Sequence, residues 1–280
     1  MIVGIIGLGL IGGSLAKSIK TKTLHNVIAF DIDTSTMTMA KLCGAVDEEL
    51  TDENLSQCDL LFLAVSPSNA VEWIENHAEN LTNKSVVIDL CGVKRVVCEK
   101  IYPLAHKRGF IFIGGHPMAG RERSGFVNST AELFDGASMI LTPELENGLS
   151  IDILEKLKAF FVDVGFSSVT FTSPEEHDRI IAYTSQLAHV ISSAYVKSPD
   201  AVKRRGFSAG SFRDMTRVAR LDEKLWTELF LSNRDFLIEQ IEIIMKNINE
   251  YLSAIKDNDA DKLEKLLREG REMKALAGGN

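Results

Sequence analysis

The sequence has little of what marks disulfide-rich, metal-binding or membrane proteins. Its four cysteines show neither CxxC spacing nor histidines placed to complete a metal site, which argues against a disulfide framework and against zinc. We therefore expect no metal and a reducing, cytoplasmic setting. No segment is apolar for long enough to span a membrane, and no basic residues precede the N-terminal apolar stretch as they would in a signal peptide.

Basic residues are also fewer than acidic ones. The 280 residues carry 31 Lys and Arg against 39 Asp and Glu, a net charge of −8, which argues against general nucleic-acid binding. With 45% hydrophobic and 25% charged residues, the chain is typical of a globular protein with one large or two ordinary domains.

The N-terminus carries the most informative motif. An apolar run, residues 2–6, leads directly into a Gly-x-Gly-x-x-Gly pattern and then into helix-forming residues. The pattern consists of Gly7, Leu8, Gly9, Leu10, Ile11 and Gly12. Such glycines allow a sharp turn, close approach of the backbone to a pyrophosphate, and close packing of the helix on the strand. The motif predicts a dinucleotide site at the helix N-terminus, where free N–H groups face the phosphates.

A second apolar run, residues 27–30, ends in Asp31, nineteen residues after Gly12. An acid at this spacing grips the ribose 2′-hydroxyl and repels the extra phosphate of NADP. No arginine lies between Gly12 and Asp31, so we expect the cofactor to be NAD. The alternative is a glycine turn that begins an ordinary α/β domain, with Asp31 only capping a helix or solvated.

Helix-like and strand-like segments then alternate as far as residue 171. The expected strands are 60–65, 85–89, 110–113, 137–141 and 167–171, and the expected helices are 35–42, 69–75, 93–105 and 151–162. About seven strands with helices between them predict a doubly wound, mostly parallel Rossmann-type sheet, and we assign it residues 1–172.

From residue 173 the pattern changes to helix alone. Ser173 and Pro174, followed by two glutamates, form a helix start, and the expected long helices are 175–196, 223–256 and 260–276. We assign residues 173–280 to an all-α domain that binds substrate. Its extensive apolar surface predicts a homodimer, unless these residues pack against their own Rossmann-type domain.

Ligands in open α/β sheets gather at the carboxyl ends of the strands. Val65, Ser66 and Pro67 follow the expected third strand and should pass beside the nicotinamide ribose. His116, between glycines and a proline in the segment 114–125, follows the fifth. Histidine acts as a base near neutral pH, so His116 is the candidate base, against the alternative of a structural histidine in a tight loop. For His177 the expected role is packing between the domains.

A basic cluster lies in the α-domain. Between residues 203 and 220 there are six Lys and Arg and a single acid. Guanidinium groups bind carboxylates through two parallel hydrogen bonds, so we interpret the cluster as a site for an acidic substrate, with Arg217 as its best candidate. For residues 203–205 a solvated face is the better interpretation.

Together these segments resemble the prephenate dehydrogenase family of tyrosine biosynthesis. The resemblance rests on Gly-Leu-Gly-Leu-Ile-Gly-Gly-Ser-Leu-Ala at 7–16, Gly-Gly-His-Pro-Met-Ala-Gly-Arg-Glu-Arg-Ser-Gly at 114–125, Glu-His-Asp at 176–178 and Phe-Arg-Asp-Met-Thr-Arg at 212–217. It covers almost the whole chain in order, and the histidine motif is its specific part.

The resemblance implies NAD-dependent oxidative decarboxylation of prephenate to 4-hydroxyphenylpyruvate by a homodimer. His116 would accept the ring hydroxyl proton and Arg217 would bind a substrate carboxylate. His189 would line the pocket, Glu122 would gate or order it, and Gly210 would contribute from the partner subunit. Lys94 and Ser124 complete the expected substrate-binding residues.

One position departs from the family pattern. Relatives commonly carry a serine before Val-Lys after the fourth strand, where this chain has Gly92. The resemblance therefore implies that His116 lacks a hydroxyl partner, so that a water or Ser124 would bond to it in a slower or differently tuned enzyme.

Other functions remain open from the sequence alone. Arogenate dehydrogenase, or a cyclohexadienyl dehydrogenase of mixed specificity, is the nearest alternative, and a non-catalytic NAD-sensing dimer is a more remote one. A β-hydroxyacid dehydrogenase would favour a catalytic lysine in the α-domain. We expect no appended regulatory domain, so tyrosine is expected to inhibit, if at all, by competing at the active site.

Overall fold

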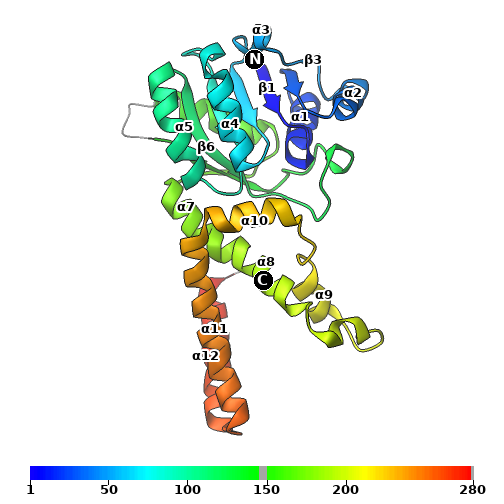
Figure 1. The fold of residues 1–280 in the computed structure, drawn as a ribbon, viewed down its shortest axis with the longest axis vertical. Helices are drawn as coiled ribbons and strands as arrows, with labels where there is room; N and C mark the ends of the chain where they lie inside the picture. The colour runs from blue at the N-terminus through cyan, green and yellow to red at the C-terminus, as the bar shows by residue number, and fades with distance from the viewer. Residues whose placement is uncertain (145–149, 279–280) are drawn as a thin grey trace.

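A computed structural model describes residues 1–144 and 150–278 and contains an eight-stranded sheet (Figure 1). The strand order is β3-β2-β1-β4-β5-β6-β7-β8. The strands are β1 (Ile2–Ile6), β2 (Asn26–Phe30), β3 (Glu48–Glu49), β4 (Leu60–Leu63), β5 (Val86–Asp89), β6 (Ile111–Pro117), β7 (Ser138–Thr142) and β8 (Ser168–Phe171). All neighbours pair in parallel except β6 and β7, which confirms the expected mostly parallel sheet.

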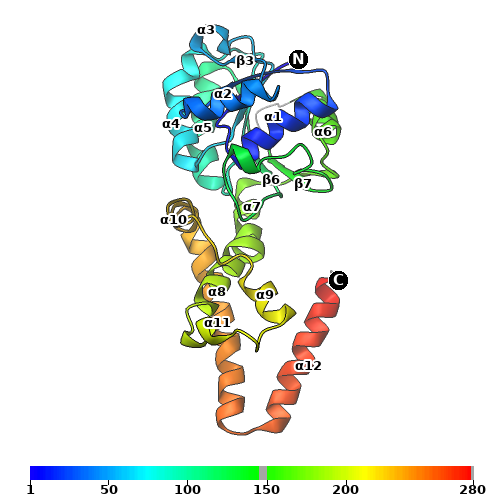
Figure 2. The same cartoon turned by 90° about the vertical axis from the view of Figure 1, so that its right-hand side faces the viewer.

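Helices cover both faces of the sheet (Figure 2). One face carries α1 (Leu10–Lys22), α2 (Thr34–Leu42) and α6 (Ile151–Asp163), and the other carries α3 (Asp52–Leu55), α4 (Pro67–His77) and α5 (Arg95–Arg108). Short 3₁₀ turns lie at η1 (Ala78–Asn80) and η2 (Phe126–Asn128). Each face buries its own apolar cluster, and on the α6 side the rings of Phe160 and Phe161 pack on Phe62. Burial on both faces is why these strands are nearly continuous apolar runs.

Strand β6 is longer than the sequence predicted. The expected strand ended at residue 113, but residues 114–117 pair in antiparallel register with β7, with His116 opposite Ile140. The pairing carries the chain four residues further in extended conformation. His116 therefore lies within the strand, near its carboxyl end, and not in the loop after it.

The remaining chain is helical and extends away from the sheet (Figures 1 and 2). It contains α7 (Pro174–Ile181), a π-helical segment η4 (Ala182–Leu187), α8 (Ala188–Tyr195), η5 (Pro199–Lys203), α9 (Gly210–Thr216), α10 (Glu223–Ser232), α11 (Arg234–Lys256) and α12 (Ala260–Ala277). Helix α10 lies across the edge of the sheet domain, and α11 and α12 form a long arm. No residue of α12 is buried within this chain.

The single helix expected over 223–256 is interrupted at Asn233, between α10 and α11. The Asn233 side chain is fully buried and donates to the Asp178 carbonyl at 2.8 Å and to Gln186 Oε1 at 2.9 Å. These bonds hold it at φ −125°, outside the helical range, and fix α10 against α7 and η4. Among the described residues no helix has both the length and the apolar character to cross a membrane.

Candidate active site

The glycine loop is tightly packed on the sheet and open towards solvent at one residue. Gly7 has φ +88°, and a Cβ there would lie 2.7 Å from the Ala64 carbonyl oxygen and from the Val65 side chain. A Cβ at Gly12 would lie 1.9 Å from the Gly7 oxygen. At Gly9, by contrast, a Cβ would meet nothing within 4 Å. The loop therefore has room for a ligand at Gly9, beside the N-terminus of α1.

Asp31 is bound to this loop. Its Oδ2 accepts a 2.6 Å hydrogen bond from the Leu8 N–H, and its Oδ1 accepts one from the Asp33 N–H at 2.9 Å. The carboxylate is thereby fixed at the end of β2 and is partly exposed, as a ligand of a ribose hydroxyl must be. Leu10 and Ile11 begin α1 and are also partly exposed. These residues fit a dinucleotide.

The segment after β4 borders the same loop. Val65 and Ser66 are partly exposed, and Pro67 is the first residue of α4. Across from them, Glu228 on α10 accepts a 2.7 Å hydrogen bond from the Ser68 N–H. The helical part of the chain therefore closes over the carboxyl end of β4, where the reactive end of a bound dinucleotide is expected.

His116 forms a pair with His177. Its Nδ1 lies 2.9 Å from His177 Nε2, and His177 Nδ1 lies 2.8 Å from Asp178 Oδ1. His116 keeps part of its surface exposed, whereas His177 and Asp178 are buried. Burial, together with the nearby His177 and Lys94, holds the pKa of His116 well below its ordinary 6.5. His116 is therefore neutral near pH 7, as a general base must be.

The sequence analysis missed His177 as a site residue. It assigned His177 to packing between the domains, but the structure joins it to His116 across 61 positions of sequence. The available signal was the Glu-His-Asp triplet at the helix start, which the motif comparison included without giving it a role. Trp226, also missed, lies against His189, with ring centroids 3.9 Å apart and the ring planes tilted by 30°.

The structure gives Lys94 a different role from the one expected. Its side chain is fully buried, its ammonium forms an ion pair with buried Asp89, and it donates to the Gly115 carbonyl at 2.5 Å. Its backbone N–H binds Asp178 Oδ1 at 2.7 Å. No surface of Lys94 is left for a substrate, so the expected substrate contact is replaced by a structural one beneath His116.

Gly92 and Ser124 bear on the expected hydrogen-bond partner of His116. A Cβ at Gly92 would lie 3.3 Å from Leu229 Cδ2, so the leucine side chain borders that position. Ser124 is exposed, and its carbonyl accepts a bond from Asn128 Nδ2 at 2.6 Å. Within the described residues, the ring of His116 is hydrogen-bonded to the ring of His177 rather than to a hydroxyl group.

Arg217, the residue that follows α9, forms a 2.9 Å ion pair with Glu122 in the loop after β6. Arg217 also acts on His189 of α8: burial first, and then this guanidinium, lower the pKa of His189. Beside the pair, a cavity of about 310 Å³ is lined by Arg121, Glu122, Arg123, Asn128 and Arg220. The lining of this cavity therefore combines three guanidinium groups with one carboxylate. Gly210, at the start of α9, is exposed.

Comparisons with known proteins identify the family of this chain. Residues 15–169 match the family model described as prephenate dehydrogenase, nucleotide-binding domain, and residues 173–269 match the model described as prephenate dehydrogenase, dimerization domain. The chain belongs to the prephenate dehydrogenase family.

Relatives of this prephenate dehydrogenase family member include a prephenate dehydrogenase of Lactococcus lactis, 30% identical over 96% of this chain and 75% of that one. A cyclohexadienyl dehydrogenase of Zymomonas mobilis is 28% identical, over 97% of this chain and 94% of that one. The solved structure of prephenate dehydrogenase from Aquifex aeolicus, in complex with hydroxyphenyl propionate and NAD+, superposes with a TM-score of 0.85. It is 28% identical in sequence, and the match covers 99% of this chain and 98% of that one. Arogenate dehydrogenase of Synechocystis has a TM-score of 0.82 and 25% identity, covering 99% and 100%.

Proposed function

We propose that this chain catalyses the NAD-dependent oxidative decarboxylation of prephenate to 4-hydroxyphenylpyruvate, a step of tyrosine biosynthesis. It is an NAD-dependent oxidoreductase of the prephenate dehydrogenase family. The observation that carries the assignment is His116: a neutral, partly exposed imidazole at the same edge of the sheet as the dinucleotide cradle.

The proposed chemistry needs one base. NAD, when bound, supplies the hydride acceptor. His116 takes the proton of the ring hydroxyl while the hydride leaves the ring carbon that carries this hydroxyl. The ring carboxylate then departs as carbon dioxide, its electron pair makes the ring aromatic, and the phenol oxygen takes the proton back from His116.

The remaining site residues hold the substrate. Arg217 binds a carboxylate, and Glu122, its ion-pair partner, orders the entrance and opens when substrate takes the guanidinium. His189, held against Trp226, lines the pocket. Ser124 and the partner subunit's Gly210 complete it. The guanidinium groups around the entrance cavity favour a substrate with two negative charges.

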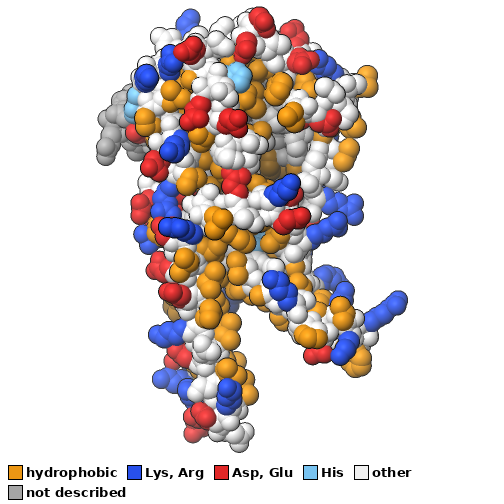
Figure 3. Space-filling view, in the orientation of Figure 1, with side chains coloured by type: hydrophobic (Ala, Val, Ile, Leu, Met, Phe, Trp, Pro, Cys, Tyr) orange, Lys and Arg blue, Asp and Glu red, His pale blue; other side chains and the backbone are white. Residues whose placement is uncertain are grey.

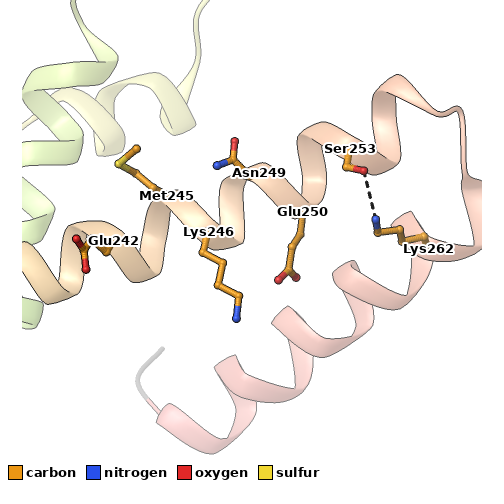
Figure 4. A pocket seen from close by; sticks show the side chains of 7 residues that line it. All are labelled: Glu242, Met245, Lys246, Asn249, Glu250, Ser253 and Lys262. Carbon is orange, nitrogen blue, oxygen red and sulfur yellow. Dashed lines mark hydrogen bonds between the residues drawn. The ribbon is translucent and has the colours of Figure 1, made fainter.

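The enzyme works as a homodimer, with residues 1–172 binding NAD and residues 173–280 forming the dimer and the substrate site. Apolar side chains run along the α11 arm (Figure 3), and several are half or more exposed, among them Ile238, Met245, Ile248 and Ile255. Between α11 and α12 lies an opening of about 490 Å³ that includes Met245 and Lys262 (Figure 4). A second copy of the chain would cover these surfaces.

Two further properties belong to this proposal. Tyrosine, which keeps the carboxylate and the para oxygen of the product, would compete with prephenate at Arg217 and His116. The four cysteines carry free thiols, as a reducing cytoplasm keeps them.

Arogenate is the second candidate substrate, because the chain is similar over nearly its whole length to a cyclohexadienyl dehydrogenase and to an arogenate dehydrogenase. Arogenate carries an amine where prephenate carries a keto group, so both present the same ring hydroxyl to His116 and a side-chain carboxylate to Arg217. The two substrates would differ only at the side chain.

The test is NADH or NADPH formation with prephenate and with arogenate, each under NAD and under NADP. We expect turnover with NAD and prephenate. The variant His116→Asn should bind NAD normally and lose roughly 10²–10⁴-fold in kcat, the usual contribution of a general base. The control is His25→Asn, because His25 precedes β2 and so lies at the amino end of that strand, whereas His116 lies near the carboxyl end of β6. NAD binding without turnover on either substrate would instead support the non-catalytic dimer.

A further inference from the structure

His177 is a buried titratable residue that the proposed chemistry does not use. It comes from α7, in the helical part of the chain, yet its ring is tilted by 60° against that of His116 with centroids 5.1 Å apart. A buried imidazole in contact with a base can fix the orientation of that base and the position of its proton. The inference below rests on the proposed role of His116.

The hydrogen bonds of Asp178 fix where His177 carries its proton. Asp178 Oδ1 accepts from the Lys94 N–H at 2.7 Å, and Oδ2 accepts from the Arg95 N–H at 2.9 Å and Nε–H at 3.4 Å. A group that accepts this many donors is an ionised carboxylate, which only accepts. His177 Nδ1, 2.8 Å from Oδ1, must therefore carry a hydrogen and donate it.

A neutral His177 with its proton on Nδ1 has a bare Nε2. That atom lies 2.9 Å from His116 Nδ1, so His116 must carry its own proton on Nδ1 and donate it to His177. The Nε2 of His116 is then left bare. In a neutral imidazole the bare nitrogen is the one that accepts a proton.

We infer that the buried pair His177 and Asp178 positions His116 and sets its tautomer, with Nδ1 protonated and Nε2 free to take the substrate proton. His177 is a positioning residue in this arrangement, since it contacts the base and not the substrate. It does the work expected of a serine at position 92, where the structure places Leu229 against Gly92.

The arrangement requires a neutral His177. A protonated His177 would donate from Nε2, turn His116 Nδ1 into an acceptor and move the His116 proton to Nε2, which abolishes the base. Around the pair, Lys94 opposes a positive charge, while Asp89 and Asp178 favour one; Arg95 neutralises Asp178 on the side away from His177. Burial is the largest effect and lowers the pKa of His177 below 6.5, so the ring is neutral at pH 7.

Two substitutions separate positioning from mere packing. In His177→Gln the amide oxygen can accept from His116 Nδ1 while the amide N–H donates to Asp178, so the tautomer is kept. In His177→Leu the space is filled but no acceptor remains. We expect His177→Gln to keep kcat within roughly tenfold of the parent and His177→Leu to lose roughly 10²–10⁴-fold, the range for loss of a general base. KM should change little in either, because Arg217 is untouched.

A readout independent of turnover is ¹⁵N NMR of the full-length protein labelled at histidine, which distinguishes protonated from bare ring nitrogens. The expected parent spectrum near pH 7 shows His116 with a protonated Nδ1 and a bare Nε2, assigned by loss of its signals in His116→Asn. His177→Gln should keep that pattern, and His177→Leu should lose it. His25→Gln is the matched control: the spectrum should lose only the signals of His25, and the His116 pattern and the kinetics should stay as in the parent.

The outcomes separate this inference from the proposed function. A parent enzyme inactive on both substrates, with the expected His116 tautomer, would overturn the function and leave the tautomer assignment standing. An active enzyme whose His116 carries its proton on Nε2, or whose His177→Leu variant keeps parental kcat, would overturn the inference. If His177→Leu does not fold, the parent spectrum still decides. Gly92→Ser gives a further check: parental kcat supports His177 as the partner of His116, and a large gain contradicts it.

Discussion

Lys94→Met tests whether Lys94 has a structural role beneath His116 or the substrate contact expected from the sequence. Both Lys94 and Asp89 are fully buried and form an ion pair. Methionine has nearly the shape of the lysine stem, so the substitution removes the charge and leaves little cavity. Asp89 would keep the N–H groups of Cys91 at 3.0 Å and Gly115 at 3.2 Å, but would have no cation.

The magnitude follows from the uncompensated charge. Removing one partner of a buried ion pair costs about 3–5 kcal/mol of unfolding free energy, because the remaining charge stays buried without its partner. The double variant Lys94→Met/Asp89→Asn leaves no buried charge, and replacement of a whole buried pair is often close to neutral. We therefore expect the double variant to be more stable than Lys94→Met alone.

The assay is urea unfolding followed by circular dichroism, with steady-state kinetics on the same preparations. Lys84→Met is the control, because Lys84 is exposed and such a change should stay within about 0.5 kcal/mol. Parental stability of Lys94→Met with a raised KM for substrate would refute the structural role and restore the substrate contact. A double variant no more stable than the single one would refute the charge argument.

Three further predictions concern the active site. Arg217→Ala should raise KM for prephenate roughly 10- to 100-fold, the value of a charge-assisted hydrogen bond, and leave stability nearly unchanged because its ion pair is exposed. kcat/KM should be constant near neutral pH and fall only below pH 6.5, because the pKa of His116 lies well below that value and protonation removes the base. Gly12→Ala should abolish NAD binding in titration calorimetry, since its Cβ would lie 1.9 Å from a carbonyl oxygen of the same loop; normal binding would contradict the glycine-loop assignment.

Much of the sheet was predictable because its signals are local. The apolar runs, the glycine spacing and the Pro174 helix start each lie within a few contiguous residues, and the structure places elements there. The errors came where a distant partner changed a local preference. Pairing with β7 extended β6 through His116, and the hydrogen bonds of Asn233 to α7 and η4 interrupted a helix whose apolar periodicity runs through that position.

The candidate site was predictable only in part. Histidine at 116 and arginine at 217 stood out by residue type and by their surroundings in sequence. The burial of Lys94 could not be predicted, because a lysine after a strand has the same sequence signature whether it faces a ligand or an aspartate. The role of His177 could not be predicted either, since its hydrogen-bond partner His116 is 61 residues away in the sequence.

The sequence by itself determined that this chain builds a dinucleotide cradle and presents one histidine at the end of a strand, because those features are written in short, contiguous stretches. Only the tertiary structure decided which nitrogen of that histidine is free. The docking of α7 against the sheet brings Asp178 and His177 to His116. The carboxylate fixes the tautomer of His177, and His177 in turn fixes the tautomer of His116.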